Sequence, residues 1–341
     1  MNTPKTAEIY WTLVNSPTEG ENNSKPKANF QKISACQRLQ SQMLFTEIRN
    51  TEIKADLMDD PNISRQVKHR IQVASQRGSG TASLVVPTEK CLEMDDNATL
   101  QAVCCRLGLP IPGLHMRTRC LPNCTQMGPH ATLTDSMVRE SIMTGTHFLG
   151  CNLKSCGTYD RHNEIAQVAF AWFKYELKYS GSTGSFDSNY VGISAKGSSK
   201  HTDGQVWGGA QYPGRVAFDM SIVNPTAVSH SGAAACAESF LNPNARTRNA
   251  EKTKTDKYGL LYQQRGMDFV PIVFTSSGGM GEQFQRRYWN THWIRVAEED
   301  EAMKIGPWVA RKRKAFWEAR FAVAVANCNA RMISRSQHIT D

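Results

Sequence analysis

The spacing of hydrophobic and polar positions changes along the chain and divides it into segments. Residues 1–30 are rich in Pro, Asn, Ser, Lys and Glu around one short apolar run, so we expect a disordered N-terminus. Residues 31–110 are mixed and charged with weak helical spacing, which predicts a helical linker region. Within it, the run Asp96–Leu107 has helical spacing, and Gly108 and Pro110 end that helix.

Residues 159–300 alternate between helical and extended spacing, which is the pattern of an α/β domain. A helix over Arg161–Tyr179 is expected to bury one apolar face, because large apolar residues recur there three and four positions apart. The other expected elements, in chain order, are a Ser/Gly-rich loop at 180–185, a candidate strand at 190–195, a strand at 216–223, a helix at about 248–264, a strand at 269–275, and helices near 281–295 and 307–329.

The composition is that of a globular protein with a basic balance. The chain has 341 residues, which suggests two or three domains, and its 40% hydrophobic and 21% charged residues exclude wholesale disorder. The formal net charge of +9 favours a polyanionic partner such as DNA or RNA, although a solubilising surface charge explains the same value. No apolar run is long enough to span a membrane, and the first residues lack the apolar core of a secretory signal. We therefore expect a nuclear or cytoplasmic protein whose ten cysteines are thiols, metal ligands or buried small residues rather than disulfides.

Residues 111–158 are rich in Cys, His, Pro and Met and lack long apolar periodicity, so something other than a large core must order them. Four residues form two pairs, each separated by three positions: Cys120 with Cys124, and His147 with Cys151. Soft ligands paired in this way are typical of a tetrahedral structural Zn²⁺ site. The gap of 22 residues between the pairs leaves His130 and Cys156 as alternative ligands, and buried free cysteines with surface histidines as the alternative to a metal site.

Two aspartates are candidates for holding Mg²⁺ or Mn²⁺ in phosphodiester cleavage. Such a site needs carboxylates beside the scissile phosphate, and the usual scaffold places one Asp at a strand or loop end and the other on the next strand. Asp203 lies in a loop, and Asp219 lies inside the apolar run 215–223, where an unpaired carboxylate is costly to bury. Strand alternation puts Asp219 on the same side as Ala217 and Ser221. A salt bridge to a nearby Arg or Lys is the alternative explanation for Asp219.

A third carboxylate and a lysine would complete such a catalytic set. Glu164, in the first turn of the preceding helix, is the candidate carboxylate, and a solvated helix position is the alternative. Lys254 and Lys257 lie three positions apart on one face of the later helix, followed directly by Tyr258. An ordinary surface helix explains the same two lysines.

Several short motifs follow one another in a recognisable order: His147-Phe-Leu-Gly-Cys151, Arg161-His162-Asn163-Glu164-Ile165, Asp203, Phe218-Asp219-Met220-Ser221-Ile222-Val223 with Asn224-Pro225, Lys254-Thr-Asp-Lys257-Tyr258, and Phe269-Val-Pro-Ile-Val-Phe274 with Gly278-Gly279. This ordered set resembles the C-terminal portion of non-LTR retrotransposon proteins that carry a restriction-like endonuclease. Upstream runs look like the linker that follows the polymerase in those proteins: Ser79-Gly-Thr-Ala82, Leu84-Val-Val-Pro87 and Arg106-Leu-Gly-Leu-Pro110. The resemblance covers roughly residues 70–300.

The resemblance implies a Cys/Cys/His/Cys zinc segment followed by a PD-(D/E)XK nuclease domain, which is an α/β fold with a mixed sheet flanked by helices. The implied roles are structural Zn²⁺ on Cys120, Cys124, His147 and Cys151, a catalytic Mg²⁺ or Mn²⁺ on Asp203 and Asp219 assisted by Glu164, and Lys257 as the catalytic lysine displaced onto a helix. Arg161 and His162 are implied to lie near the scissile phosphate. In this family the nuclease nicks chromosomal DNA, and reverse transcription is primed at the nick.

The chain departs from the family pattern in ways that bear on activity. Thr202 precedes the first Asp where the standard motif has Pro, and Ser221 stands where that motif has Lys. No polymerase motif occurs in the chain. These departures indicate a fragment, a degenerate copy or a domesticated remnant. The alternative function is therefore that of a zinc-containing nucleic-acid binding remnant without catalytic activity.

The C-terminal segment 301–341 is expected to be a basic amphipathic helix. It begins with the run Arg311-Lys312-Arg313-Lys314, followed by Phe316 and Trp317. Such a helix binds phosphates or serves as a nuclear import signal, and a solvated helix face over a small core is the alternative. The candidate DNA-binding residues are therefore Arg161, His162, Lys254, Arg311, Lys312 and Arg313.

Overall fold

A computed structural model of the chain describes residues 51–63, 65–75, 79, 81–114, 140–151, 157–183, 202–208, 214–226, 242, 244–304 and 308–338. The chain forms two compact units, residues 1–64 and 65–341. In the first unit, residues 51–59 are helical. The second unit contains every candidate site residue, and the expected domain boundaries near 110, 158 and 300 all fall inside it.

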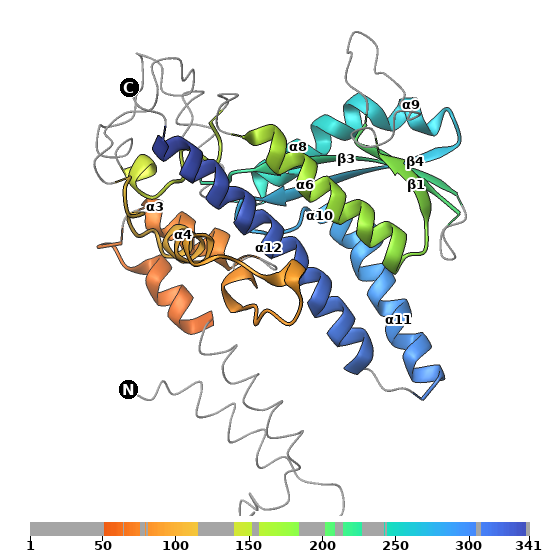
Figure 1. The fold of residues 1–341 in the computed structure, drawn as a ribbon, viewed down its shortest axis with the longest axis horizontal. Helices are drawn as coiled ribbons and strands as arrows, with labels where there is room; N and C mark the ends of the chain where they lie inside the picture. Colours follow the sequence, from red (N-terminus) through yellow and green to blue (C-terminus); the bar gives the residue numbers. More distant parts are fainter. Residues whose placement is uncertain are drawn as a thin grey trace, which may run out of the picture. The chain divides into compact units, whose positions relative to one another are not determined.

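The second unit contains a four-stranded mixed sheet (Figure 1). Its strands are β1 (Ser180–Thr183), β2 (Gly204–Trp207), β3 (Arg215–Val223) and β4 (Met267–Thr275), and they lie side by side in that order. The first three strands pair antiparallel, whereas β3 and β4 pair parallel over their whole length. Parallel neighbours need a long crossover, and a helical segment between β3 and β4 provides it.

The second unit also contains helical elements, only some of which lie against the sheet. In chain order they are α3 (Arg65–Ala74), the 3₁₀ turns η2 (Thr81–Leu84) and η3 (Lys90–Leu92), α4 (Asp96–Leu107), α6 (Thr158–Ala171), the π-helical turn η6 (Trp172–Glu176), α8 (Ala245–Lys254), the π-helical turn η7 (Thr255–Gly259), α9 (Leu260–Gln263), α10 (Glu282–Phe284), the π-helical turn η8 (Gln285–Asn290), α11 (Thr291–Ala302) and α12 (Trp308–His338). Within the part of the chain described above, no helix combines the length and the apolarity needed to cross a bilayer. The expected α/β class, with a mixed sheet flanked by helices, is confirmed.

The long elements form where the apolar spacing predicts them. The apolar positions expected on one face of the first α/β helix are all buried in the main core: Ile165, Val168, Ala169, Trp172, Phe173 and Leu177. Helix α4 spans Asp96–Leu107 as expected. Asp95 caps its first turn by accepting from Ala98 N at 2.6 Å, and Gly108 ends it with a left-handed φ of 68°.

The first strand forms where a loop was expected, so that prediction was wrong. Ser180–Thr183 pairs with β2 although Ser and Gly are poor strand formers. The small residues permit a close approach, because a Cβ at Gly181 would lie 2.5 Å from the carbonyl oxygen of Gln205. The candidate strand at 190–195 lies outside the described residues.

The two faces of the sheet carry different cores. Alternate residues of β3, including Phe218 and Met220, pack with α6, α10, α11 and α12 in the larger, aromatic core. Ala217, one position from Phe218 on the strand, packs instead with Tyr258 and Tyr262 of the η7–α9 segment. Helix α12 belongs to the larger core rather than standing apart from it, and Figure 1 shows it running along α6.

A buried glutamate joins three helical elements at one end of the larger core. Glu176 of η6 accepts hydrogen bonds from His292 Nε2 of α11 at 3.0 Å and from Trp317 Nε1 of α12 at 2.9 Å, and it also pairs with Arg313. Burial alone would raise the pKa of Glu176, but these hydrogen bonds and the charge of Arg313 bring it below its ordinary value. The ionised carboxylate therefore stabilises the fold.

Replacing this carboxylate should destabilise the second unit. Glu176→Gln removes the negative charge that pairs with Arg313 and leaves one acceptor oxygen where there were two, so His292 and Trp317 cannot both keep their hydrogen bond. The free energy of unfolding at pH 7 should therefore fall by about 2–4 kcal/mol. Because the folded-state pKa is depressed, this contribution is present above the ordinary pKa of 4.5 and is lost as the pH falls below it. Urea denaturation at pH 7 and pH 4 measures both effects.

Glu299→Gln is the matched control, because Glu299 forms an exposed pair with Arg295 one turn away on α11. Its effect should stay within about 0.5 kcal/mol. Equal effects of the two substitutions would contradict the role assigned to Glu176.

Candidate active site

The pairing of β2 with β3 brings Asp203 and Asp219 together. Asp203 immediately precedes β2, and its backbone N–H donates to Phe218 O of β3 at 3.0 Å. Its Oδ2 accepts from Met220 N at 2.5 Å, so the Asp203 carboxylate is held beside the middle of β3. Burial raises the pKa of Asp219, and the neighbouring Asp203 carboxyl raises it further, so the two carboxyl groups lie close enough to interact. The two candidate metal ligands thus occupy one site.

Lys254 is the lysine that meets this pair. The Asp219 side chain is only 7% exposed, and Lys254 Nζ forms an ion pair with its Oδ2. Lys257, the expected catalytic lysine, is exposed, and its Nζ lies 4.7 Å from the centroid of the Tyr258 ring. The structure therefore places Lys254 where the resemblance led us to expect Lys257.

His162 approaches the aspartates from α6. Its Nε2 lies 3.0 Å from Asp203 Oδ2, and its Nδ1 lies 3.3 Å from Asn163 Oδ1. Burial alone would lower the pKa of His162, but the hydrogen bond and the charge of Asp203 outweigh it and raise that pKa. An imidazole that is protonated more readily than usual adds positive charge beside the carboxylates.

The pKa values of the two aspartates shift in opposite directions. Burial is the largest cause that raises the pKa of Asp219, to about 6, and the neighbouring Asp203 raises it further against the opposing charge of Lys254. Burial would also raise the pKa of Asp203, but the hydrogen bond and charge of His162 bring it below its ordinary value. Two carboxylates that share a poorly hydrated site in this way favour a bound cation.

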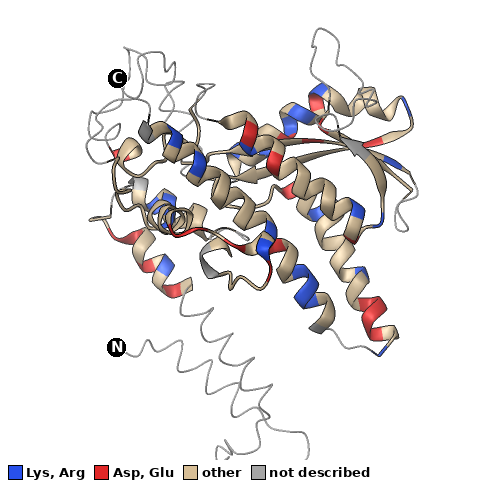
Figure 2. Cartoon of the chain, viewed as in Figure 1, with Lys and Arg blue, Asp and Glu red and all other residues tan. Residues whose placement is uncertain are grey.

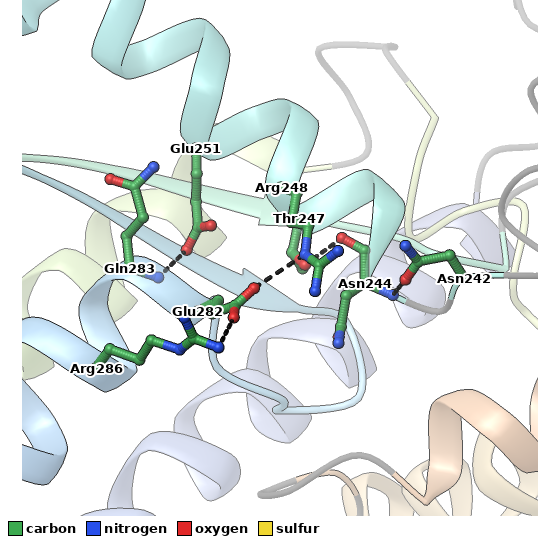
Figure 3. Close-up of polar contacts among 8 residues, drawn as sticks. All are labelled: Asn242, Asn244, Thr247, Arg248, Glu251, Glu282, Gln283 and Arg286. Atoms are coloured by element: carbon green, nitrogen blue, oxygen red, sulfur yellow. Dashed lines mark hydrogen bonds and ion pairs between the residues drawn. The ribbon is translucent and has the colours of Figure 1, made fainter.

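Helix α8, which carries Lys254, is fastened to the start of α10 (Figure 3). Glu251 is 1% exposed and accepts from the backbone N–H of Gln283 at 2.8 Å, and Arg248 Nε donates to Glu282 Oε2 at 2.9 Å. A Cβ at Gly281 would lie 2.4 Å from Glu251 Oε1, so a side chain at this position would push the Glu251 carboxylate away from Gln283. The hydrogen bond of Glu251 lies one helical turn before Lys254, so it anchors the part of α8 that carries this lysine. No motif in the sequence pointed to Glu251.

Two candidates from α6 have other partners. Glu164 forms an ion pair with Arg331 of α12, and its side chain is 41% exposed. Arg161 is buried, and its guanidinium donates to Asn329 Oδ1 at 3.1 Å and to Leu149 O at 3.0 Å. Arg161 therefore joins α6 to α12 inside the fold, and its expected position near the scissile phosphate stays a prediction.

The basic residues at the start of α12 lie at the surface. Arg311 and Lys312 are exposed, while Arg313 pairs with the buried Glu176. Figure 2 shows Lys and Arg gathered at this end of α12 and again along α8. These two groups of cations are the candidate surfaces for nucleic-acid phosphates.

Only half of the expected zinc ligands can be located. Cys120 and Cys124, and the alternatives His130 and Cys156, lie outside the described residues. His147 and Cys151 are both buried, and the ring of His147 meets Phe148 edge-on. Among the side chains that the structure describes, no three His, Cys, Asp or Glu residues form a group that could hold a metal ion.

Comparisons of the chain with protein-family models, with curated proteins and with solved structures found no match. Four side chains form this site: Asp203 just before β2, Asp219 on β3, Lys254 on α8 and His162 on α6.

Removing one charge from the aspartate pair should stabilise the metal-free protein. The pKa of Asp219 is raised from 3.8 to about 6, so its protonated form favours folding, and that contribution is lost as the pH rises through 6. Asp219→Asn imitates the protonated form, and it should raise the free energy of unfolding at pH 8 by up to about 3 kcal/mol. The gain should shrink at pH 5 and vanish near pH 3.5.

Thermal and urea unfolding across this pH range test the expectation. Asp256→Asn is the control, because Asp256 is exposed and its effect should be small at every pH. A loss of stability at pH 8 in Asp219→Asn would show that Asp219 serves as a structural ion pair instead.

Proposed function

We propose that the chain is a restriction-like endonuclease of retroelement origin that nicks DNA with Mg²⁺ or Mn²⁺. The observation that carries the proposal is the convergence of Asp203 and Asp219 from neighbouring strands, with Lys254 beside them. The mixed sheet flanked by helices is the architecture expected of a PD-(D/E)XK domain. The basic charge of the chain fits a nucleic-acid substrate.

The residues fit a hard divalent cation. Mg²⁺ is typically held by one or two carboxylates, the remaining positions being filled by water and substrate phosphate. Asp203 and Asp219 meet that requirement without a third protein ligand. Burial, and then the neighbouring Asp203, raise the pKa of Asp219, and a bound cation would offset both effects. When bound, the cation would activate a water and offset the charge that develops on the phosphate.

Lys254 takes the place of the lysine that the motif lacks. Ser221 stands at the standard lysine position, on the same side of β3 as Asp219. Lys254 reaches that side from α8, so its ammonium group lies where it stabilises a phosphate oxygen that gains charge. His162 holds Asp203 in place and contributes further positive charge when protonated.

A second function, nucleic-acid binding without cleavage, is favoured by one observation. The Lys254 ammonium group already forms an ion pair with Asp219. The negative charge of the two aspartates is therefore partly neutralised without a metal ion. A binding remnant would retain DNA in a manner that weakens steeply with salt and would show no nicking.

Plasmid nicking with Mn²⁺ distinguishes the two functions. Asp219→Asn should abolish nicking while the protein stays folded, because the same substitution is expected to stabilise the metal-free protein. Lys254→Met should slow nicking by about 100-fold, the cost of losing one charge-stabilising donor. Lys257→Met, at the exposed neighbouring lysine, should retain the parent rate within about threefold. Nicking that survives Asp219→Asn would overturn the proposed activity.

We also propose a structural zinc on Cys120, Cys124, His147 and Cys151, separate from the catalytic cation. Metal analysis of the purified protein should find about one zinc per chain. Cys124→Ser should lower this content strongly, whereas Cys91→Ser, at an exposed free cysteine of the described region, should leave it unchanged. A parent protein without zinc, or equal zinc in both variants, would exclude this site.

A further inference from the structure

A buried hydrogen bond joins the residue before Asp203 to the crossover between β3 and β4. Thr202 is 2% exposed, and Tyr262, on α9, is completely buried. Thr202 Oγ1 and Tyr262 Oη lie 2.6 Å apart, and either hydroxyl can donate. The two residues are 60 positions apart in the sequence, so the contact ties the chain beside Asp203 to a distant element.

This hydrogen bond adds to the contacts that hold Asp203. Asp203 lies just outside β2, which begins at Gly204. Its backbone N–H donates to Phe218 O at 3.0 Å and its Oδ2 accepts from Met220 N at 2.5 Å, so both of these hydrogen bonds hold it from β3. The bond between Thr202 and Tyr262 holds the preceding residue from α9. The chain around Asp203 is therefore fixed by two different elements.

The Tyr262 ring is itself held firmly by its neighbours. It stacks on Phe269 of β4, with ring centroids 6.0 Å apart and 21° between the planes, and it meets Tyr258 at 6.4 Å. The three rings pack with Ala217 of β3, two residues before Asp219. Side chains packed in this way keep one rotamer, so the Tyr262 hydroxyl is a fixed point relative to β3.

The same crossover also carries Lys254. The elements α8, η7 and α9 follow one another without a break, and Lys254 ends the first of them. Lys254 pairs with Asp219, and Tyr262 bonds to the residue beside Asp203. One helical segment therefore holds both halves of the aspartate pair.

We propose that Tyr262 is a positioning residue for the cation site: through Thr202, its hydroxyl sets where the Asp203 carboxylate stands relative to Asp219. The inference rests on the proposed nuclease function, because it assigns this hydrogen bond to a site that binds a divalent cation. Tyr262 acts through Thr202 and touches neither the cation nor the DNA. Small divalent cations such as Mg²⁺ demand near-ideal ligand geometry, so a small displacement of Asp203 lowers the affinity for the cation.

Mn²⁺ binding without DNA, followed by electron paramagnetic resonance, tests the proposal. Tyr262→Phe removes only the hydroxyl, and it should weaken Mn²⁺ binding about fivefold, which is the order of magnitude of one buried hydrogen bond. Thr202→Val should have the same effect, whereas Thr202→Ser keeps a hydroxyl and should bind Mn²⁺ as the parent does. The double variant of Thr202→Val and Tyr262→Phe should bind no more weakly than either single variant, because both changes remove the same hydrogen bond.

Tyr288→Phe is the matched control. Tyr288 is also a buried tyrosine, and its hydroxyl donates to Asp268 Oδ2 at 2.5 Å, but it packs in the larger core on the other face of the sheet. Urea denaturation should show that both tyrosine variants are destabilised, whereas only Tyr262→Phe should lose affinity for Mn²⁺. In plasmid nicking, Tyr262→Phe should lower kcat at limiting Mn²⁺, leave KM for DNA unchanged, and recover the parent rate at saturating Mn²⁺.

The outcomes separate this proposal from the nuclease function. If Tyr262→Phe binds Mn²⁺ as tightly as the parent, or if Tyr288→Phe weakens binding equally, the positioning role is overturned and the proposed activity stands. A parent chain that binds no Mn²⁺ and does not nick DNA would overturn both.

Discussion

The structure of the site depends on two carboxylates that the β2–β3 pairing forces together. Asp203 is held by backbone hydrogen bonds to β3, and Asp219 belongs to that strand, so neither can move away from the other without breaking the sheet. Burial, and then the charge of Asp203, raise the pKa of Asp219 against the opposing charge of Lys254, while His162 keeps the pKa of Asp203 below its ordinary value. A cation bound between the two carboxylates would offset the cost of burying them, which is the reason for proposing a metal site there.

The rest of the unit serves to hold these four groups in place. The larger aromatic core fixes α6, and with it His162, against one face of the sheet. The smaller cluster of Tyr258, Tyr262 and Phe269 fixes the crossover helices against the other face. Glu251 then fastens α8 to α10, so that Lys254 enters the site from a helix that is anchored at a defined point.

The long elements could be predicted from the sequence, because their apolar spacing reflects which face is buried. The short strands could not. Ser180–Thr183 has neither alternation nor β-branched apolar residues, and it pairs because Gly181 permits the approach of β2. Such a contact is made between segments that are distant in sequence, so the local pattern of residues cannot predict it.

The sequence indicated the two aspartates of the site, but the direction of the helical side chains around them could not be predicted. Asp203 and Asp219 were expected to act together from the strand arrangement, but adjacent helix positions point in different directions, so Arg161 turns into the core while His162 faces the site. Lys254 and Lys257 would share a face in a regular α-helix. The π-helical turn η7, which begins at Thr255, widens the helix between them and removes that relation.

The central claim is that Asp203 and Asp219 form one cation site, and direct Mn²⁺ binding tests it most plainly. Electron paramagnetic resonance can count the bound Mn²⁺ in the parent chain, in Asp203→Asn and in Asp219→Asn without any substrate. The account predicts a site in the parent that is weakened at least tenfold by either single substitution. A parent that binds no Mn²⁺, or variants that bind it as tightly as the parent, would contradict the account.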